Sequence, residues 1–266
     1  MRNRFFVTLG LIAVLLGSLS VIGLAGTLDD ILSSGELVIC TELGNVPWNY
    51  QDPATGEVTG FTTELVQMYA DSIGVDLVVK SFDWAGVIPA LLNNKADMIA
   101  APLSRTMTRS TKILYTEPYI IAPGVVVARK GEFASLDDLN KSGVILTTTS
   151  GSIHEEIAIA NYPNATMNAV PTVADHNAAL VAGRADAVFT GKFVGESTVE
   201  GNANLEVLPG FTFMDSFACA VRFDSFDLWT SFNLFMRLIK LDGRYADLYE
   251  KWFEVEWVPY NIETAN

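Results

Sequence analysis

Residues 90–99, ALLNNKADMI, are matched 89 residues later by residues 179–188, ALVAGRADAV. Each copy has the pattern of a helix end with an apolar face, a tight turn that carries a cation and an Asp, and a buried strand. That order is half of a right-handed β-α-β crossover. Two such copies predict two similar α/β lobes.

Ligands of open α/β sheets bind where the strands end. The residues that follow each copy, 102–109 and 189–192, are therefore the first candidates for a binding site. The first set contains Pro102, Leu103, Ser104 and Arg109, and the second contains Thr190, Gly191 and Lys192.

The rest of the chain alternates between strand-like and helix-like segments. The order β-α-β-α-β over residues 37–103 predicts a mostly parallel sheet, and residues 144–190 repeat the theme. Two long apolar runs, 120–129 and 214–222, are expected to cross between the lobes, with the helices 228–241 and 244–253 packing on the first lobe.

The predicted division is residues 1–25 as a signal peptide, 26–121 plus 215–266 as lobe 1, and 122–214 as lobe 2. Two crossing strands predict a hinge about which the lobes close.

The N-terminus has the pattern of an export signal. Arg2 and Arg4 precede an uncharged apolar stretch, and the small residues Gly23 and Ala25 suit cleavage. The expected location is the periplasm or another extracytoplasmic space. The apolar stretch is long enough to anchor the chain in a membrane if it stays uncleaved. Thr27 stands where a lipoprotein signal needs Cys, which argues against lipid anchoring.

The charge and the cysteines exclude several classes of function. The formal net charge of −14 becomes −16 once Arg2 and Arg4 are removed, so binding to nucleic acid is not expected. Cys40 and Cys219 each lie in an apolar strand-like run, and they are either a disulfide pair or two small buried hydrophobic residues. The only histidines, His154 and His176, have no metal-ligand spacing, so neither a metal nor a cofactor is expected.

An ordered set of short motifs resembles the bacterial extracellular solute-binding proteins of polar amino-acid ABC transporters. In family order, the motifs are Gly44 to Tyr50, Gly60-Phe61, Trp84 with Ile88 to Leu91, Asp97 to Ile99, Ser104 to Arg109, Glu117 to Tyr119, Asp242 to Tyr245 and Tyr249 to Phe253. The resemblance covers nearly all of the mature chain. It implies a type II periplasmic-binding-protein fold with two lobes joined by a two-strand hinge. It also implies a small ligand between the lobes, a membrane permease as partner, and a monomer with no enzymatic activity.

The resemblance assigns Arg109 to a ligand carboxylate, helped by the hydroxyl of Ser104. A guanidinium suits this role because it donates two parallel hydrogen bonds to a carboxylate. From the second lobe, the helix start at Ser150, Gly151 and Ser152 is expected to approach the same group. A purely local cap is the alternative there, and Ile153 stands where the family usually has a second hydroxyl.

Further contacts are expected around the ligand side chain. Trp84 and Trp48 would form aromatic walls, with core packing as the alternative. Glu42 stands where basic-amino-acid binders of the family place an acid toward the ligand, with an exposed strand-end charge as the alternative.

One position departs from the family. Gly191 stands where amino-acid binders usually have an Asp that pairs with the α-ammonium of the ligand. Either Glu42 or Asp215 replaces that Asp, or the ligand lacks the ammonium. Lys192 beside Arg109 would favour an anionic ligand unless Lys192 is only a solvated charge.

The sequence therefore predicts the binding component of an ABC importer for a small carboxylate-bearing solute, an amino acid or a derivative. Two other classes remain open. One is a dehydratase of the prephenate or cyclohexadienyl type, which would need a proton donor in the cleft. The other is a sensory or scaffold module that descends from a binding protein.

Overall fold

The computed structural model describes residues 27–258, and the predicted signal peptide lies outside this range. In the first half of the fold, β1 (Glu36–Thr41) pairs in parallel with β4 (Asp76–Ser81) and with β5 (Met98–Ser104). The helices α3 (Phe61–Ile73) and α4 (Val87–Leu92) connect these strands. The arrangement is the predicted β-α-β-α-β unit.

The second half of the fold repeats this arrangement with strands and helices of different lengths. In it, β8 (Ile145–Thr147) pairs in parallel with β10 (Ala187–Gly191) and β9 (Thr166–Met167). Three helices surround these strands: α6 (Ile153–Asn161), α7 (Val173–Val181) and α8 (Lys192–Glu200). The sequence did not predict α8, which begins directly after β10.

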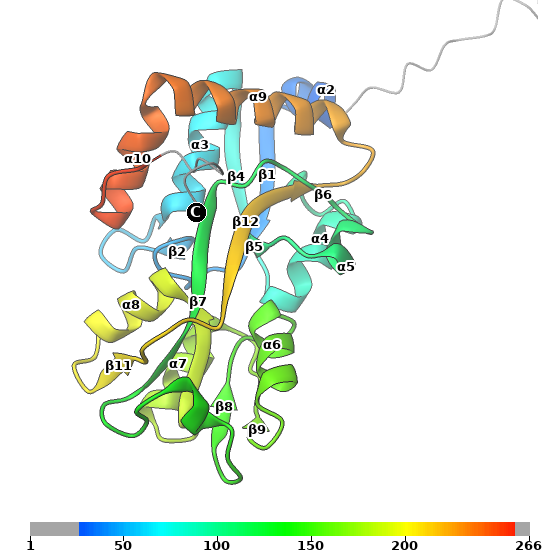
Figure 1. Cartoon of the computed structure of the whole chain (residues 1–266). Coiled ribbons are helices and arrows are strands. Elements are labelled where there is room, and N and C mark those ends of the chain that lie inside the picture. The colour runs from blue at the N-terminus through cyan, green and yellow to red at the C-terminus, as the bar shows by residue number, and fades with distance from the viewer. Residues whose placement is uncertain (1–26, 259–266) are drawn as a thin grey trace, which may run out of the picture.

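Two long strands, β7 (Ile120–Arg129) and β12 (Phe213–Val221), join the two lobes (Figure 1). They pair with each other in antiparallel fashion between Ile120–Gly124 and Phe213–Phe217. Beyond this stretch, β7 continues beside β10, and β12 continues beside β5. The main order β4-β1-β5-β12-β7-β10-β8-β9 therefore runs through both lobes, with β6 (Leu114–Tyr115) on β12 and β11 (Leu205–Val207) on β7. The predicted crossing points, 121/122 and 214/215, fall within these two strands.

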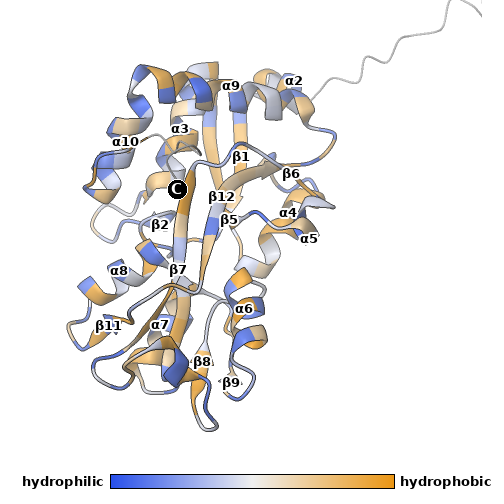
Figure 2. Ribbon diagram, in the orientation of Figure 1, coloured by the Kyte–Doolittle hydropathy of each residue, from blue (hydrophilic) through white to orange (hydrophobic). Residues whose placement is uncertain are grey.

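The first lobe is completed by α2 (Thr27–Ser34), α9 (Phe226–Asp242) and α10 (Arg244–Phe253). Along α9, Leu228, Phe232, Phe235, Met236 and Ile239 recur at helical spacing and are buried. Hydrophobic residues concentrate along the central strands, whereas the helices carry polar residues on their outer faces (Figure 2). The short elements that complete the description are the strands β2 (Tyr50–Gln51) and β3 (Val58–Thr59), α5 (Met107–Ser110), and 3-10 turns at Trp84–Gly86 and Leu136–Leu139.

The repeated Asp has the same structural role in both lobes. The Asp97 carboxylate accepts a hydrogen bond from the amide of Val38 in β1 at 3.0 Å, and the amide of Asp97 donates to the carbonyl of Val38 at 2.8 Å. In the second lobe, Asp186 makes the same pair of bonds to Ile145 of β8, at 2.8 and 2.7 Å. Each Asp thus sets the register of its strand against the neighbouring parallel strand.

An arginine at the end of each crossing strand binds the repeated turn. Arg222, which follows β12, donates to the carbonyls of Ala96 at 2.7 Å and of Leu91 at 3.4 Å. Arg129, the last residue of β7, donates to the equivalent carbonyls in the second copy, those of Ala185 at 2.8 Å and Leu180 at 3.0 Å, and its other terminal nitrogen pairs with Asp186 at 3.0 Å. The two crossing strands are therefore fixed to the two copies of the repeat.

The two cysteines are separate buried thiols. Cys40 packs in a small cluster beneath α4, and Cys219 lies in the main core of the first lobe. Burial raises the pKa of Cys40 to about 12 and that of Cys219 well above its ordinary value, so both stay protonated. Of the two interpretations left open by the sequence, the structure supports small buried hydrophobic residues.

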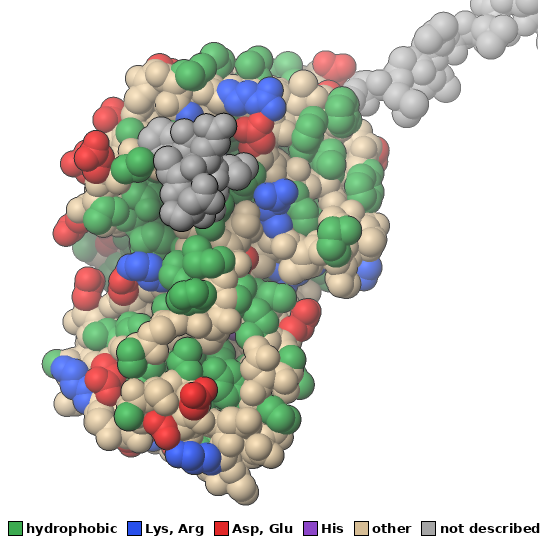
Figure 3. All heavy atoms as spheres, in the orientation of Figure 1, with side chains coloured by type: hydrophobic (Ala, Val, Ile, Leu, Met, Phe, Trp, Pro, Cys, Tyr) green, Lys and Arg blue, Asp and Glu red, His purple; other side chains and the backbone are tan. Residues whose placement is uncertain are grey.

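Within residues 27–258, no helix combines the length and the apolar character needed to cross a bilayer. Acidic and basic side chains are interspersed across the face of the molecule in Figure 3.

The arginine that ends β7 is expected to be needed for stability. Arg129→Ala leaves the carbonyls of Leu180 and Ala185 without their donor, and an unpartnered buried carbonyl costs about 1–3 kcal/mol. The free energy of unfolding, measured by urea denaturation, should fall by that amount. Lys130→Ala is the control, since the neighbouring Lys130 is exposed, and it should change stability by less than about 0.5 kcal/mol. Equal unfolding midpoints for the two variants would contradict this role of Arg129.

Candidate functional site

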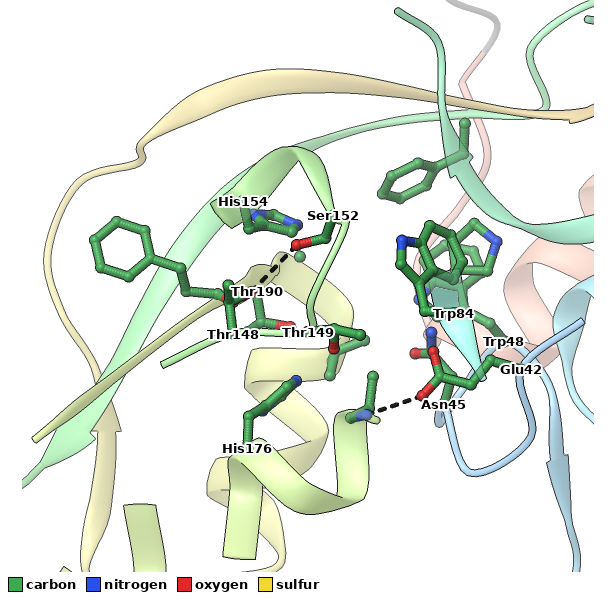
Figure 4. A pocket seen from close by; sticks show the side chains of 16 residues that line it. Glu42, Asn45, Trp48, Trp84, Thr148, Thr149, Ser152, His154, His176 and Thr190 are labelled. Carbon is green, nitrogen blue, oxygen red and sulfur yellow. Dashed lines mark hydrogen bonds between the residues drawn. The ribbon is translucent and has the colours of Figure 1, made fainter. Parts of the chain in front are cut away.

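A cavity of about 50 Å³ lies between the two lobes (Figure 4). Its walls are formed by loops of the first lobe and, in the second lobe, by the starts of α6 and α7 and the end of β10. The lining residues are Glu42, Asn45, Trp48, Trp84 and Pro102 from the first lobe, Thr148, Thr149, Ser152, His154, Val173, His176, Phe189, Thr190, Gly191 and Val194 from the second, and Phe217 from β12.

Seven of the residues predicted from the sequence line this cavity, and eight do not. Those that line it are Glu42, Trp48, Trp84, Pro102, Ser152, Thr190 and Gly191. Those outside the lining are Leu103, Ser104, Arg109, Ser150, Gly151, Ile153, Lys192 and Asp215. Four of the second group, Ser104, Arg109, Ser150 and Gly151, are predicted carboxylate contacts.

Arg109 joins the two lobes instead of lining the cavity. Its helix, α5, begins with the side chain of Thr106 as cap, which turns Arg109 back over the end of β5. The guanidinium donates to the carbonyl of Ser104 at 3.1 Å and, across the cleft, to the carbonyl of Gly151 at 2.9 Å. It also lies 5.9 Å from the centre of the Trp84 ring. The group expected to hold a carboxylate is bound to protein carbonyls from both lobes.

Ser104 and Asp215 are buried partners of each other. The Ser104 hydroxyl donates to Asp215 Oδ2 at 2.7 Å, and the amide of Ser216 donates to Oδ1 at 2.7 Å. Burial raises the pKa of Asp215, and the hydrogen bonds from Ser104 and Ser216 and the charge of Arg109 oppose this shift. Leu103 is fully buried in the core beneath α4. These three residues therefore support the strand ends on which the cavity is built.

Backbone amides at the start of α6 donate hydrogen bonds to side chains of the same segment. The Ser152 hydroxyl accepts from the amide of Glu155 at 3.3 Å, and the Glu155 carboxylate accepts from the amide of Gly151 at 2.7 Å. The amide of Ser150 donates to the carbonyl of Val170, and Ile153 begins the helix outside the cavity. The predicted cap is present, but the Gly151 amide that would attract an anion already binds the carboxylate of Glu155.

Glu42 is the one charged side chain among the residues that line the cavity, and it also joins the lobes. It is 3% exposed, and its Oε1 accepts from the amide of Val173, the first residue of α7, at 2.9 Å. The other oxygen, Oε2, is buried without a hydrogen-bond partner, as is Oδ1 of Asn45 nearby on the same loop. Two acceptor atoms in the first-lobe wall of the cavity thus lack donors.

Burial raises the pKa of Glu42 to about 7. The amide of Val173 opposes this shift, whereas the carboxylates of Asp83 and Asp175 add to it. The protonation of Glu42 therefore changes near neutral pH.

Two histidines were missed as site residues. Burial lowers the pKa of His154 to about 3 and that of His176 to about 4, so both rings are neutral at neutral pH. A signal was available, since they are the only histidines of the sequence and each lies in the first turn of a second-lobe helix. That signal was considered only for metal binding. Within residues 27–258, no group of three His, Cys, Asp or Glu side chains is arranged to hold a metal ion.

Other missed residues come from the end of β8 and from the loop after β1. Thr148 donates to the carbonyl of Phe189, which ties the polar end of β8 to β10. The run of three Thr residues at 147–149 after an apolar strand was the available signal. Asn45 closes a turn in which its carbonyl accepts from the amides of Trp48 and Asn49, but no side-chain role was inferred for it.

Both tryptophans line the cavity, but their surroundings differ. Trp48 is 1% exposed and packs edge-to-face against Phe61, Phe193 and Phe217. Trp84 is 8% exposed, and Figure 4 shows its ring on the first-lobe side of the cavity, opposite Thr149 and Ser152. Trp48 is mainly a core residue, whereas Trp84 presents its ring to the cavity.

Of the two alternatives left open for Lys192, the structure favours a surface charge. Lys192 is the first residue of α8, and its ammonium pairs with Glu196 one turn along the helix, outside the cavity lining. It therefore adds no positive charge to the lining. Gly191 does line the cavity, and a Cβ there would lie 3.8 Å from Cζ of Phe217, an ordinary contact. Steric crowding at Cβ therefore does not explain the absence of an Asp.

Two α/β lobes joined by two strands, with a cavity lined by polar and aromatic residues between them, define a ligand-binding protein of the type II periplasmic class. The sequence signature of the bacterial extracellular solute-binding proteins, family 3, matches residues 37–255, and the chain belongs to this family.

Three comparisons illustrate the membership. The chain is 25% identical over 219 residues to a putative ABC transporter arginine-binding protein from Escherichia coli, covering 80% of this chain and 89% of the relative. It is 23% identical to a cyclohexadienyl dehydratase from Pseudomonas aeruginosa, covering 91% and 92%. The crystal structure of an ancestral amino acid-binding protein, a precursor of cyclohexadienyl dehydratase, superposes with a TM-score of 0.81 at 30% identity, covering 85% of this chain and 99% of the ancestral protein.

Removing the Arg109 side chain should favour the open form. Arg109→Ala removes the bond to the Gly151 carbonyl, and a hydrogen bond of this kind is worth about 0.5–1.5 kcal/mol, or roughly a twofold to tenfold change in the ratio of closed to open molecules. Small-angle X-ray scattering should record a larger radius of gyration. Arg105→Ala is the matched control, since Arg105 bonds to Ser216 near its own strand. Identical scattering from both variants would argue against this bond as a closing contact.

Proposed function

We propose that this protein is the substrate-binding component of an ABC importer that works outside the cytoplasm with a membrane permease. Its ligand is a small solute of the amino-acid class, an amino acid or a derivative, enclosed between the two lobes. Family membership over residues 37–255 and the hinge built from β7 and β12 support the mode of binding. The polar groups of the cavity support a cationic group on the ligand.

The observation that carries this proposal is the pair of unpartnered acceptors, Oε2 of Glu42 and Oδ1 of Asn45. A buried polar atom without a partner costs about 1–3 kcal/mol, and more when it is charged. An ammonium or guanidinium group supplies N–H donors to both oxygens and neutralises the carboxylate. Binding such a group therefore removes the free-energy cost of leaving these two buried oxygens without donors.

Trp84 adds to the same preference. The face of an indole ring attracts cations, with roughly 2 kcal/mol available when the pair is desolvated. A cation that binds Glu42 lies on the side of the cavity where this ring is exposed. The interpretation of Glu42 as an acid directed at the ligand is preferred to that of an exposed strand-end charge, because Glu42 is buried.

The predicted carboxylate contact at Arg109 stays a prediction. It requires the guanidinium to release the carbonyl of Gly151, to which it donates across the cleft.

Affinity for a cationic ligand should depend on pH through Glu42. The cation binds the ionised carboxylate, so below a pKa of about 7 a proton must leave before binding. Affinity measured by isothermal titration calorimetry is expected to be constant above pH 8 and to fall toward tenfold per pH unit between pH 7 and 5. The charged neighbours Asp83 and Asp175 are acidic, and His154 and His176 stay neutral over this range, so the slope belongs to Glu42.

The isosteric change Glu42→Gln serves as the matched control. It should weaken binding of the cation by more than tenfold at pH 8 and remove the pH dependence, because no carboxylate remains to titrate. A Glu42→Gln protein that keeps wild-type affinity and its pH profile would disprove this assignment of the cation site.

A dehydratase is the second candidate, and one observation favours it. A general acid needs a pKa near the working pH, and the pKa of Glu42 lies near 7 inside the cleft. Incubating the protein with prephenate or arogenate and following phenylpyruvate or phenylalanine tests this function. Turnover that is lost in Glu42→Gln would support an enzyme, whereas no product above the buffer rate is expected for a binding protein.

A further inference from the structure

We propose that the outer face of α9 is the interface of a homodimer. Two copies of the chain pack there with their α9 helices antiparallel, related by a two-fold axis near Leu234. The surface belongs to the first lobe and the cleft takes no part in it, so the dimer is independent of the proposed function. The family resemblance implies a monomer, and the side chains on the outer face of α9 argue against that expectation.

The outer face of α9 carries a ridge of exposed apolar side chains. Figure 3 shows hydrophobic side chains along the upper edge of the first lobe, where α9 lies in Figure 1. At 100° per residue they fall within about a third of the helix circumference. These side chains are between 48% and 83% exposed, and they are Phe226, Leu234, Leu238 and Leu241. The same stripe includes Thr230, Arg237 and Asp227, whose carboxylate accepts from the amide of Leu28 in α2.

The opposite side of α9 is apolar as well. Leu228, Phe232 and Ile239 are buried there and belong to the core of the first lobe. A surface helix normally turns polar residues outward, and a helix with apolar residues on both sides is normally covered on both sides. A contiguous apolar surface of this kind marks a contact with a protein or a membrane. The ridge of α9 is therefore expected to have a partner.

The charges around the ridge differ between its two ends. Acidic side chains lie at the N-terminal end of α9, where the Thr27 hydroxyl bonds to that of Ser225 at 2.8 Å and holds the start of α2 beside it. The exposed acids there are Asp224, Asp29 and Asp30. Basic side chains gather at the C-terminal end, namely Arg237, Lys240 and Arg244, of which Arg237 pairs with Glu117 and Arg244 with Asp242. The face is thus acidic at one end and carries its cations at the other.

A two-fold axis near Leu234 brings the unlike ends together. Phe226 precedes Leu234 by eight residues and Leu241 follows it by seven, so antiparallel helices place the phenyl ring of one copy beside Leu241 of the other. Asp224 and Arg244 lie ten residues before and after Leu234, and the same arrangement places them opposite each other. An isologous interface requires this self-complementarity of shape and charge. A second copy of the chain therefore fits the face.

Two other partners fit the ridge less well. Insertion into a bilayer would bring the exposed acids Asp29, Asp30, Asp224 and Asp242 toward the lipid, where carboxylates are disfavoured. A permease has to distinguish closed from open molecules and must therefore contact both lobes. Helix α9 lies at the end of the first lobe away from the second lobe (Figure 1). A dimer through α9 leaves the cleft of each copy free.

The association is expected to be weak. The chain carries a formal net charge of −14, which opposes contact between two copies. At an ionic strength of about 0.15 M the screening length is about 8 Å, so the charges at the interface outweigh the distant ones. A single pair of helices forms a small interface, for which we expect a Kd on the order of 10 µM.

The test is the mass of the intact mature protein, measured by size-exclusion chromatography with light scattering between about 1 and 200 µM. The wild type should rise from the mass of one chain toward that of two. Leu234→Glu should stay at one chain, because it brings two carboxylates together near the two-fold axis and weakens the dimer by more than tenfold. Ile159→Glu is the matched control, since Ile159 on α6 is 56% exposed, as is Leu234, and it should dimerise like the wild type.

Charge reversal tests the antiparallel arrangement. Asp224→Lys and Arg244→Glu should each weaken the dimer, because each places like charges opposite one another in both halves of the interface. The double variant with both changes should restore the wild-type Kd. If neither single change alters the Kd, the antiparallel arrangement is wrong.

A wild-type protein that stays a single chain at about 200 µM would overturn the dimer. A dimer that persists in Leu234→Glu would overturn it too, because another face then forms the contact. Binding of the monomer to phosphatidylcholine vesicles, lost in Leu234→Glu, would replace the second copy with a membrane surface. Circular dichroism confirms that the variant is folded, and Leu238→Glu takes its place if it is not. All of these outcomes leave the proposed ligand binding in the cleft untouched.

Discussion

The arginine at the end of each crossing strand is the contact on which this architecture depends. Arg222 and Arg129 donate to equivalent carbonyls in the two copies of the repeat, and the Asp of each copy fixes its strand against the next. These bonds fix where β5 and β10 begin, and the cavity lies at the opposite, carboxyl ends of these strands. Because β7 and β12 each belong to both lobes, the same bonds connect the hinge to the walls of the cleft.

Two hydrogen bonds across the cleft come from residues that the sequence predicted to be ligand contacts. Glu42 accepts from the first amide of α7, and Arg109 donates to the carbonyl of Gly151 before α6. A carboxylate that accepts from an amide at a helix start and a guanidinium that donates to a backbone carbonyl both make favourable interactions, and neither requires a ligand. The difference between them is that Glu42 keeps one oxygen free inside the cavity, whereas Arg109 is not among the residues that line it. Closure and selection of a cation are thus coupled through a single side chain.

Much of the fold was predictable because the local pattern and the tertiary structure agree. The run 120–129 is apolar and β-branched, and it is β7 with the same bounds; the helix predicted at 244–253 is α10. Prediction from the sequence failed for a short segment whose structure depends on packing against neighbouring elements. Residues 192–200 have a weak apolar pattern, and α8 forms there because Gly195 packs closely on Val125 and Val127 of β7. The division into residues 26–121 plus 215–266 and 122–214 stays a prediction.

The site was less predictable than the fold, for a physical reason. Sequence motifs identify which residues lie near the strand ends, and Glu42, Trp84 and Gly191 do line the cavity. They do not say which polar groups bind each other. The pairing of Ser104 with Asp215, of Gly151 with Glu155 and of Lys192 with Glu196 removes three predicted contacts from the cavity. His154 and His176 join it because the two helices that carry them begin at the cleft.

The most direct test of the account is native mass spectrometry of the secreted protein purified without denaturation, compared with Glu42→Gln. The account predicts a retained small molecule whose mass and fragments show an ammonium or guanidinium group, present in the wild type and absent from Glu42→Gln. A retained molecule without a cationic group, or one that survives in Glu42→Gln, would contradict the central claim that the cleft is a cation site built around Glu42.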